Sequence, residues 1–388
     1  MDTDERRLIL SLAFAEQYGG EPSVWSRAPG RVDLMGSHTD YNQGYVMTMT
    51  VDRDTWIAAH PREDGVVAVY SLNVAGGGEF SLDRIERDEE APWTNYVRGV
   101  ADVLRRDGRQ LRGFDALVHS TIPFGSGLSS SAALEMATLV AFQSVSGFEL
   151  DGVEMAVLGQ RAENEFVGVP CGILDQYSSA MGRAGSSLLL DCRDLSSRTV
   201  PIAEDIAVVI CDTRAARNLA GTEYQTRRAQ CEEGVRFLRS THPGILTLRD
   251  VSLEAFEAQE QDLPDTVAKR CRFIIEENQR VLDLAQALPD GDRASLANLF
   301  AQSWSGARDL YEISVPAMQL MVDAMLRSPG VIGARQAGAG FGGCMVALVE
   351  RHAVAAFAAN VVQTYSATSG VQPGVYSVIA SDGAGPVQ

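Results

Sequence analysis

The chain has 388 residues and a net charge of −18, from 33 basic and 51 acidic residues. So negative a surface repels the phosphates of nucleic acids and anionic membranes, which argues against both as partners. Hydrophobic residues make up 45% of the chain without a run long enough to cross a membrane, and the N-terminus lacks a signal-peptide pattern. Six cysteines without a CxxC pair fit a reducing compartment, so we expect a cytoplasmic protein.

The first half of the chain is rich in predicted strands. Runs of β-branched and aromatic residues predict strands, and apolar residues at helical spacing predict helices. Residues 28–44 are predicted to form turns, because Pro29, Gly30, Gly36 and Gly44 interrupt a strand-like pattern. The predicted strands lie at 45–59, 66–71, 114–120, 187–191 and 206–212, and the predicted helices at 93–106, 129–145 and 153–167.

Long amphipathic helices dominate from about residue 224. The predicted helices lie at 224–240, 266–287, 293–311, 316–327 and 352–366. Two strands flank a glycine-rich turn at 338–343, and a last strand is predicted at 375–380. Because strands gather early and helices late, without a regular strand–helix alternation, we expect an α+β protein with two lobes, residues 1–200 and 201–388.

Phosphate binding by lysine is improbable in this chain. Lys269 is its single lysine, and no GxxxxGK motif occurs. Backbone N–H groups and arginine would therefore have to hold a phosphate. Residues 122–137 suit this role, since Gly125 and Gly127 let a ligand approach the main chain and Ser129–Ser131 open a helix, whose free N–H groups attract anions. A flexible loop with an ordinary serine cap is the alternative interpretation.

Three other segments carry polar or glycine-rich patterns. Residues 28–44 concentrate short donors and acceptors, which suits a polyhydroxylated ligand but also a solvated turn. Glu163 and Asp175 are separated by a break at Gly168–Pro170, so a chain that turns back would bring both to one site. Asp175 is the stronger candidate because its neighbours are apolar. The glycine-rich turn at 338–343 fits two interpretations equally well. It could pack closely against a ligand, or it could simply form a tight hairpin.

Five segments in this order resemble the galactokinases of the GHMP kinase family. They are GRVDLMGSHTDYNQG at 30–44, PFGSGLSSSAALEMA at 123–137, CGILDQYSSAMG at 171–182, EYQTRRAQCEE at 223–233 and GAGFGGCMVAL at 338–348. The resemblance implies a two-lobed α+β GHMP kinase architecture. Its N-terminal lobe is like ribosomal protein S5 domain 2, and its C-terminal lobe is ferredoxin-like with extra helices. It also implies ATP-dependent phosphorylation of a sugar, most simply galactose, at its anomeric hydroxyl with Mg²⁺.

The resemblance also implies roles for individual residues. Asp175 is the catalytic carboxylate, acting as a base or an orienting group, and Arg31 stabilises charge on the transferred phosphoryl group. Ser131 and Glu163 bind Mg²⁺, and Ser71 contacts the nucleotide. The segment at 338–343 closes over the site. The residues that surround the ATP phosphates are Gly125, Ser126, Gly127, Leu128, Ser129, Ser130 and Ser131. The residues that line the sugar pocket are Ser37, His38, Thr39, Asp40, Gly172 and Tyr224.

The chain departs from the family pattern in its sugar motif. Galactokinases typically read GRVNLIGEHTDYN, whereas this chain has Asp33 for the asparagine and Ser37 for the glutamate associated with the C6 hydroxyl. Gln336 and Ala337 replace the usual Met-Thr. Galactose is the preferred expectation, because HTDYN, the Asp175 segment and Tyr224 are retained. An L-arabinokinase or another sugar 1-kinase is the alternative, and a catalytically silent sugar sensor is a third. We expect a monomer or weak dimer.

Overall fold

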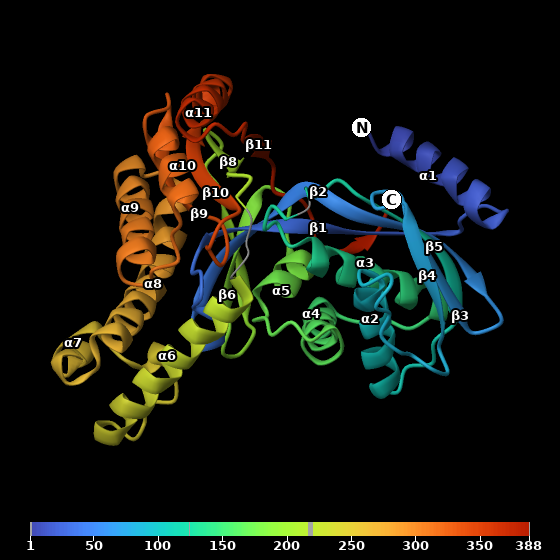
Figure 1. Ribbon diagram of the computed structural model, residues 1–388, viewed down its shortest axis with the longest axis horizontal. Helices are drawn as coiled ribbons and strands as arrows, with labels where there is room; N and C mark the ends of the chain where they lie inside the picture. The colour runs from blue at the N-terminus through green and yellow to red at the C-terminus, as the bar shows by residue number, and fades with distance from the viewer. Residues whose placement is uncertain (1, 124, 216–219, 388) are drawn as a thin grey trace.

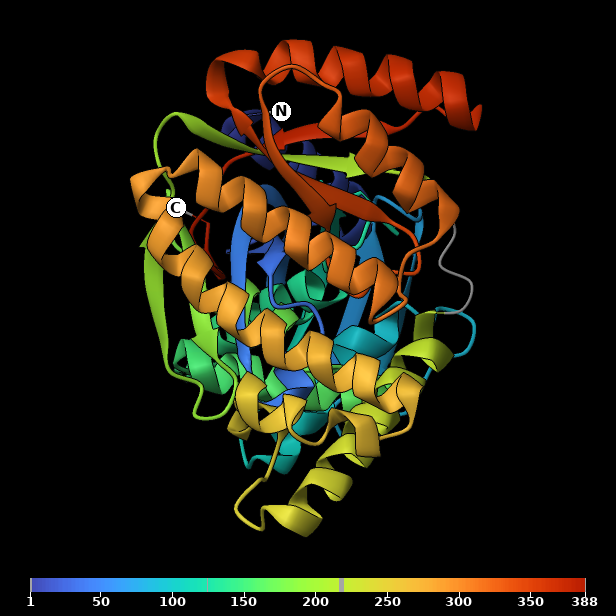
Figure 2. The same ribbon diagram turned by 90° about the vertical axis from the view of Figure 1, so that its left-hand side faces the viewer.

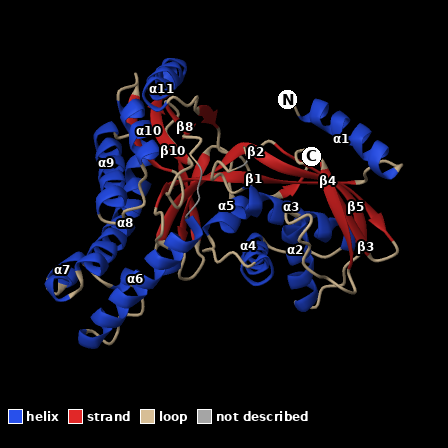
Figure 3. Cartoon of the chain, viewed as in Figure 1, coloured by secondary structure: helices blue, strands red, loops and turns tan. Residues whose placement is uncertain are grey.

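The computed structural model describes residues 2–123, 125–215 and 220–387. Two separate β-sheets, each covered by helices, form the protein (Figure 1). Colouring by secondary structure shows one long sheet beside a stack of helices that encloses the second sheet (Figure 3). This arrangement confirms the predicted α+β class, since most strands pair with antiparallel neighbours and the helices lie outside the sheets.

The first sheet has the strand order β12-β1-β2-β5-β3-β4, and β6 pairs with β2 and β7. β12 pairs with β1, so the chain returns to the first sheet near its C-terminus. The strands are β1 (Val24–Met35), β2 (Tyr45–Arg62), β3 (Val66–Ser71), β4 (Gly76–Ser81), β5 (Gly113–Ser120), β6 (Ser186–Asp191), β7 (Ser197–Pro201) and β12 (Gly385–Pro386).

Helices cover both faces of this sheet (Figure 1). They are α1 (Thr3–Tyr18), α2 (Thr94–Arg106), α3 (Ser130–Ser146), α4 (Gly152–Arg161) and α5 (Leu174–Met181). Alternate residues of β2 supply the two faces, because successive side chains of a strand point in opposite directions. Trp56 and Ala58 pack against α1, whereas Ile57 and Ala59 belong to the core beneath α2 and α3.

The second sheet has the order β11-β8-β10-β9 and antiparallel pairing throughout. Its strands are β8 (Ile206–Asp212), β9 (Val331–Gln336), β10 (Cys344–Glu350) and β11 (Gly374–Val378). Its helices are α6 (Ala220–Thr241), α7 (Leu253–Glu257), α8 (Asp265–Asp290), α9 (Arg293–Asp309), α10 (Pro316–Leu326) and α11 (Val354–Ser369). The strand order is that of a ferredoxin-like fold, with α6 to α9 added between the first two strands.

The two lobes share one hydrophobic core. Val208 and Ile210 of β8 pack with α8 and α9 and also with Val32 and Met49 of the first sheet. Val209 and Cys211, on the opposite face of β8, pack with α10 and α11. α8 and α9 lie side by side across the front of the molecule in Figure 2, where they cover strands of both sheets. This shared core fixes the position of one lobe relative to the other, so residues from both lobes can surround one site.

Two predictions of local structure need correction, and several elements were not predicted. Residues 24–35 form one long strand and not a series of turns, because Pro29 and Gly30 produce a bulge within the β1–β2 pairing. The elements that were not predicted are α1, α5, α7, β4, β7 and β12. The helix expected at 153–167 is not one regular α-helix. Its first part is α4, and a π-helical turn follows over Ala162–Val167. The other predicted helices and strands occur within a few residues of their expected ends. None of the helices in the described ranges combines the length and apolarity that a membrane crossing requires.

Candidate active site

Arg31 of β1 and Asp175, at the start of α5, form the centre of the site. Nε and Nη2 of Arg31 donate to Oδ1 of Asp175 at 2.8 and 2.5 Å. Ser129 Oγ donates to Oδ2 of the same carboxylate at 2.6 Å, and Arg31 Nη1 donates to the carbonyl oxygen of Gly127 at 2.7 Å. One guanidinium group thus joins the carboxylate to the glycine-rich loop and stabilises its negative charge.

The glycine-rich loop lies directly against the bulge of β1. The backbone N–H of Arg31 donates to the Leu128 carbonyl oxygen at 3.1 Å, and a Cβ atom on Gly30 would lie 2.6 Å from that oxygen. Gly125 and Gly127 have φ angles of 69° and 81°, which favour glycine. Ser129 precedes α3 at φ 57° and does not cap the helix, contrary to expectation, because its hydroxyl group faces Asp175.

Three acidic side chains, those of Glu135, Glu163 and Asp175, lie beside this loop. Nε2 of Gln176 bridges two of them, donating to Oε2 of Glu163 at 2.6 Å and to Oε2 of Glu135 at 2.9 Å. Burial, and then the charge of Asp175, raises the pKa of Glu163 to about 6, while a hydrogen bond from Ser131 opposes that rise. Burial also raises the pKa of Glu135 well above its usual range. Such a cluster favours a cation nearby.

A cavity of about 290 Å³ opens beside Asp175 and Arg31. Asp40 lies on its wall, where burial, opposed by a backbone hydrogen bond from Tyr41 and reinforced by the charge of Asp175, raises the pKa of its carboxyl group to about 6. Gly172 packs on Asp40 so closely that a Cβ atom there would lie 1.6 Å from Oδ2. Glycine is therefore required at 172 for Asp40 to take this position.

His38 joins the sugar motif to the glycine-rich turn at 338–343. Its Nε2 donates to the Ala339 carbonyl oxygen at 2.9 Å, so its Nδ1 accepts from the Tyr41 hydroxyl, also at 2.9 Å. Burial lowers the pKa of His38 to about 4, which keeps the ring neutral. The ring of Tyr224 lies 5.3 Å from that of His38, and Tyr224 lines the same cavity.

Behind Ser37 lies a buried network of charged groups from both lobes. Ser37 Oγ donates to Asp33 Oδ2 at 2.5 Å and accepts from Arg335 Nη2 at 3.0 Å. Arg335, on β9, also donates to Glu277 Oε1 at 3.2 Å, and Arg280 Nε donates to Glu277 Oε2 at 2.7 Å. Burial raises the pKa of Asp33, whereas both arginines hold the pKa of Glu277 below its usual range despite its burial.

A second cavity, of about 210 Å³, lies on the other side of the glycine-rich loop. Ser71, Trp93 and Tyr96 line it together with Ser130 and Ser131 of α3. The hydrogen bond between Ser131 and Glu163 connects the two cavities, since Glu163 lines the first. An elongated ligand in the second cavity would therefore reach Asp175 past the start of α3.

Most residues predicted for the site surround these two cavities. Thr39 does not line either cavity, because its hydroxyl group bonds to the carbonyl oxygens of Gly36 and Tyr45. The side chains of Ser126 and Leu128 point inward, and Ser126 Oγ donates to the Pro123 carbonyl oxygen at 2.7 Å.

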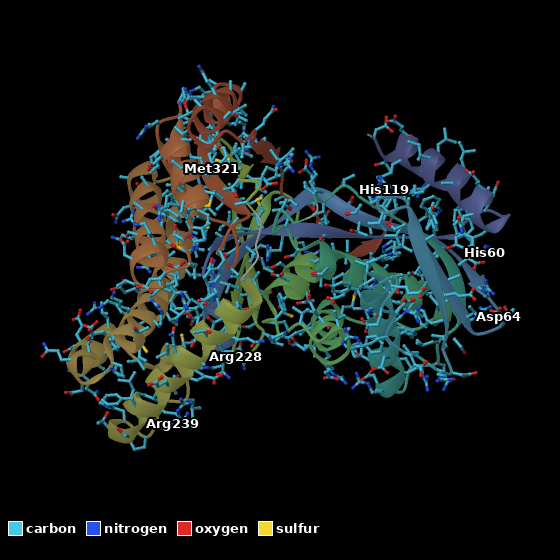
Figure 4. All side chains as sticks on the ribbon, viewed as in Figure 1. His60, Asp64, His119, Arg228, Arg239 and Met321 are labelled. Atoms are coloured by element: carbon cyan, nitrogen blue, oxygen red, sulfur yellow. The ribbon has the colours of Figure 1, made fainter. Side chains whose placement is uncertain are left out.

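Sequence reasoning missed Glu135, Glu277 and Arg335. A glutamate inside the apolar run of α3 was a usable signal for Glu135, whereas Glu277 and Arg335 sit among ordinary helix and strand residues. Figure 4 shows His60 and His119 on the first sheet, away from α5 and α6. Nδ1 of His119 accepts from Arg6 Nε at 3.0 Å, which gives that ring a structural partner.

Comparison with known families agrees with this geometry. The galactokinase galactose-binding signature matches residues 12–61, the GHMP kinases N terminal domain matches residues 95–183 and the GHMP kinases C terminal domain matches residues 284–367. These ranges contain the β1 residues of the site, the glycine-rich loop with Asp175, and the turn at 338–343.

Known relatives match over almost the entire chain. The galactokinase of Roseiflexus sp. (strain RS-1) is 45% identical over 387 residues, covering 100% of this chain and 98% of the relative. The galactokinase of Chloroflexus aggregans is 44% identical, covering 96% and 95%. The crystal structure of Lactococcus lactis galactokinase complexed with galactose has a TM-score of 0.93 at 34% identity and covers 98% of this chain and 99% of that one. Methanococcus jannaschii mevalonate kinase, at 16% identity and a TM-score of 0.64, shares the fold, covering 94% and 99%. The chain therefore belongs to the galactokinase family of GHMP kinases.

Proposed function

We propose that this protein transfers the γ-phosphoryl group of ATP to the anomeric hydroxyl of galactose, giving ADP and galactose 1-phosphate. The observation that carries the proposal is the Arg31–Asp175–Ser129 cluster, because it lies where a cavity with several charged side chains on its wall meets a glycine-rich loop at a helix N-terminus. The galactose bound to the Lactococcus lactis relative supports the choice of sugar. Asp40, His38 and Tyr224 supply the polar and aromatic groups for its hydroxyls.

In this mechanism Asp175 orients the anomeric hydroxyl and accepts its proton. A bond forms between that oxygen and the γ-phosphorus while the bond to the bridging oxygen of ADP breaks. Both oxygens of Asp175 accept hydrogen bonds, from Arg31 and from Ser129, which hold the carboxylate in one orientation. Arg31 neutralises charge on the transferred group. Backbone N–H groups of Gly125 through Ser131 hold the phosphates in place of the missing lysine.

The residues present fit Mg²⁺, which we include in the proposal. Glu135 Oε1 is buried without a hydrogen-bond partner in the described part of the chain, and Glu163 carries a raised pKa, so a cation would relieve both. Carboxylate and hydroxyl oxygens are the ligands that Mg²⁺ prefers, and Glu163 and Ser131 provide one of each. Among the described residues no group of three or more His, Cys, Asp or Glu side chains could hold a metal ion, so Mg²⁺ would need phosphate or water oxygens as further ligands. When bound, Mg²⁺ supplies charge neutralisation.

The second cavity is proposed to bind the nucleoside of ATP. Trp93 and Tyr96 give it aromatic walls, and Ser71 and Ser130 offer hydroxyl groups. Phosphates that extend from this cavity pass the start of α3 and reach Asp175. We also propose a cytoplasmic location, which the absence of disulfide bonds in the described part of the chain supports, and keep the prediction of a monomer or weak dimer.

A substrate panel tests this proposal. ADP release is measured with ATP, Mg²⁺ and one of galactose, L-arabinose, galacturonate or N-acetylgalactosamine, and the product is identified by phosphorus NMR. We expect galactose to have the highest kcat/KM, and its product to carry phosphate on the anomeric oxygen. A preference for L-arabinose of more than about tenfold, a difference of about 1.4 kcal/mol in transition-state binding, would favour the alternative kinase. Binding of ATP and sugar without turnover would identify a silent sensor.

A further inference from the structure

We propose that residues 381–384, here called the return segment, position Asp175 for phosphoryl transfer by holding the far end of α5 against β1 and β2. The return segment leads from β11 of the second sheet back to β12, which pairs with β1 (Figure 1). None of its residues lines the sugar cavity or the second cavity, so it would act through Asp175. The inference rests on the proposed function, because it gives the segment a part in the proposed transfer.

α5 is too short to fix Asp175 by itself. It has eight residues, Leu174–Met181, and isolated helices of fewer than about 12 residues are marginal in water. Asp175 lies in its first turn, and Met181 at its other end is only about 9 Å away along the helix axis. A shift or tilt of the last turn therefore displaces the carboxylate group.

The return segment supplies hydrogen bonds that the end of α5 lacks. Carbonyl groups in the last turn of a helix have no partner within the helix. The N–H of Ala384 donates to the carbonyl oxygen of Ser179 at 2.8 Å, and the N–H of Gly383 donates to that of Gly182 at 2.9 Å. Two consecutive residues of the segment thus bind the last turn of α5 and the residue that follows it.

Gly383 packs against α5 without room for a side chain. A Cβ atom on Gly383 would lie 2.2 Å from the carbonyl oxygen of Ala180 and 3.0 Å from the backbone nitrogen of Gly182. Both are main-chain atoms, so neither can rotate aside. A Cβ atom on Gly385, two residues further along, would meet no atom within 4 Å. The tight contact is therefore specific to Gly383, and Gly385 offers a matched comparison.

The return segment also holds the strand pair that carries Arg31. Thr50 of β2 lies opposite Arg31 in the β1–β2 pairing, and its hydroxyl group donates to the carbonyl oxygen of Ser381. Ser381 Oγ donates in turn to the carbonyl oxygen of Val51 at 2.9 Å. One short segment thus contacts both the helix that carries Asp175 and the strands that carry Arg31.

α5 and β1 meet directly beside these contacts. Ser179 Oγ donates at 2.7 Å to the carbonyl oxygen of Pro29, two residues before Arg31, and the carbonyl oxygen of the same serine binds Ala384. Displacing the return segment would shift α5 along β1, and with it the Asp175 carboxylate that now lies 2.5 to 2.8 Å from the Arg31 guanidinium. Phosphoryl transfer is sensitive to such a shift, because it depends on positioning.

Single-turnover formation of galactose 1-phosphate, with saturating ATP, Mg²⁺ and galactose, tests the inference on the full chain. Gly383→Ala pushes the segment away from α5 and should lower the rate by about tenfold to a hundredfold. The steady-state KM values for ATP and galactose should stay within about threefold of the wild type, since Gly383 lines neither cavity. Gly385→Ala should keep the wild-type rate, and a thermal melt of each variant verifies that it is folded at the assay temperature.

A double-mutant cycle with Asp175→Asn separates positioning from general damage to the fold. Gly383→Ala should slow the Asp175→Asn enzyme by less than about threefold, because the group that the segment positions is already lost. General damage would instead lower the rate by the same factor with and without Asp175.

Asp382→Ala is a milder variant that retains the backbone of the segment. The exposed Asp382 carboxylate accepts from the N–H of Ala184, just after α5, at 3.1 Å. Loss of this hydrogen bond should slow the wild type by about threefold to tenfold and leave the Asp175→Asn enzyme unchanged.

Three results would overturn the inference. Gly383→Ala could react at the wild-type rate, it could lose the same factor with and without Asp175, or Gly385→Ala could lose as much. If Gly383→Ala does not fold, a wild-type rate in Asp382→Ala overturns the inference instead. Failure of the wild type to form galactose 1-phosphate would contradict the proposed function and this inference together, whereas an active wild type with unaffected variants would contradict the inference alone.

Discussion

Asp40 places a titratable carboxyl group on the wall of the sugar cavity. Burial, with the nearby charges of Asp175 and Asp33, raises its pKa to about 6. Sugar hydroxyls donate to the ionised carboxylate more strongly than to the neutral acid. Galactose binding and protonation of Asp40 should therefore compete near pH 6.

We predict that the affinity for galactose falls as the pH drops through 6. The ionised carboxylate is the binding form, so the dissociation constant should rise towards a limit of about tenfold per pH unit below that pKa. Calorimetry at pH 5 and pH 7.5, without nucleotide or Mg²⁺, measures this. Asp40→Asn should abolish the pH dependence, whereas Glu163→Gln should keep it. A constant affinity from pH 5 to 7.5, or an unchanged slope in Asp40→Asn, would rule out this role.

At the residue scale, the sequence identified residues of the site more successfully than it identified their hydrogen-bond partners. Arg31, Asp175 and Glu163 were identified as site residues, and the structure brings all three to one cavity. Asp33 and Ser37 counted as two independent departures from the family pattern, although they are hydrogen-bonded to each other. No spacing rule predicts such a pair, because its geometry depends on Arg335, which lies about three hundred residues further along the chain.

Among the elements, β1 has the greatest influence on the site. Its bulge at Gly30 lets the carbonyl group of Leu128 approach the strand, and the next residue, Arg31, reaches both the loop and Asp175. Glycine and proline made this segment look like turns, since both usually interrupt strands. The bulge keeps the strand continuous and aims Arg31 at the site.

Gly30→Ala should therefore impair catalysis. The added Cβ atom would lie 2.6 Å from the Leu128 carbonyl oxygen, so the glycine-rich loop must shift away from Arg31. Misplacement on this scale lowers kcat by about a hundredfold. Steady-state kinetics with ATP and galactose, alongside a thermal melt, measures the effect. Gly20→Ala is the matched control, because a Cβ atom there meets no atom within 4 Å. Wild-type kcat in Gly30→Ala would show that the close approach is unimportant.

Long periodic helices were the most predictable elements. α8 and α9 occur almost where apolar spacing placed them. α1 was missed although its buried face includes Leu10 and Phe14, because exposed apolar residues such as Leu8 and Leu12 obscure the amphipathic pattern. The π-helical turn that presents Glu163 has no recognised sequence signal, since it arises where the last turn of α4 widens.

At the scale of the whole molecule, the site depends on contacts between the two lobes. Glu277 and Arg335 of the second lobe hold Gly36 and Ser37 of the first, and His38 binds the Ala339 carbonyl oxygen. The sequence predicted the α+β class, but it could not predict which helix and strand of one lobe meet the sugar motif of the other. These contacts are non-local and follow from packing of the shared core.

The central claim is that phosphoryl transfer takes place between Asp175 and Arg31, where the two cavities meet. The most direct test is a single-turnover assay of galactose 1-phosphate formation by Asp175→Asn, with calorimetry of galactose binding to the same variant. We predict that the rate falls by about a hundredfold to ten-thousandfold while galactose binding remains measurable. A near-normal rate of product formation in this variant would contradict the claim.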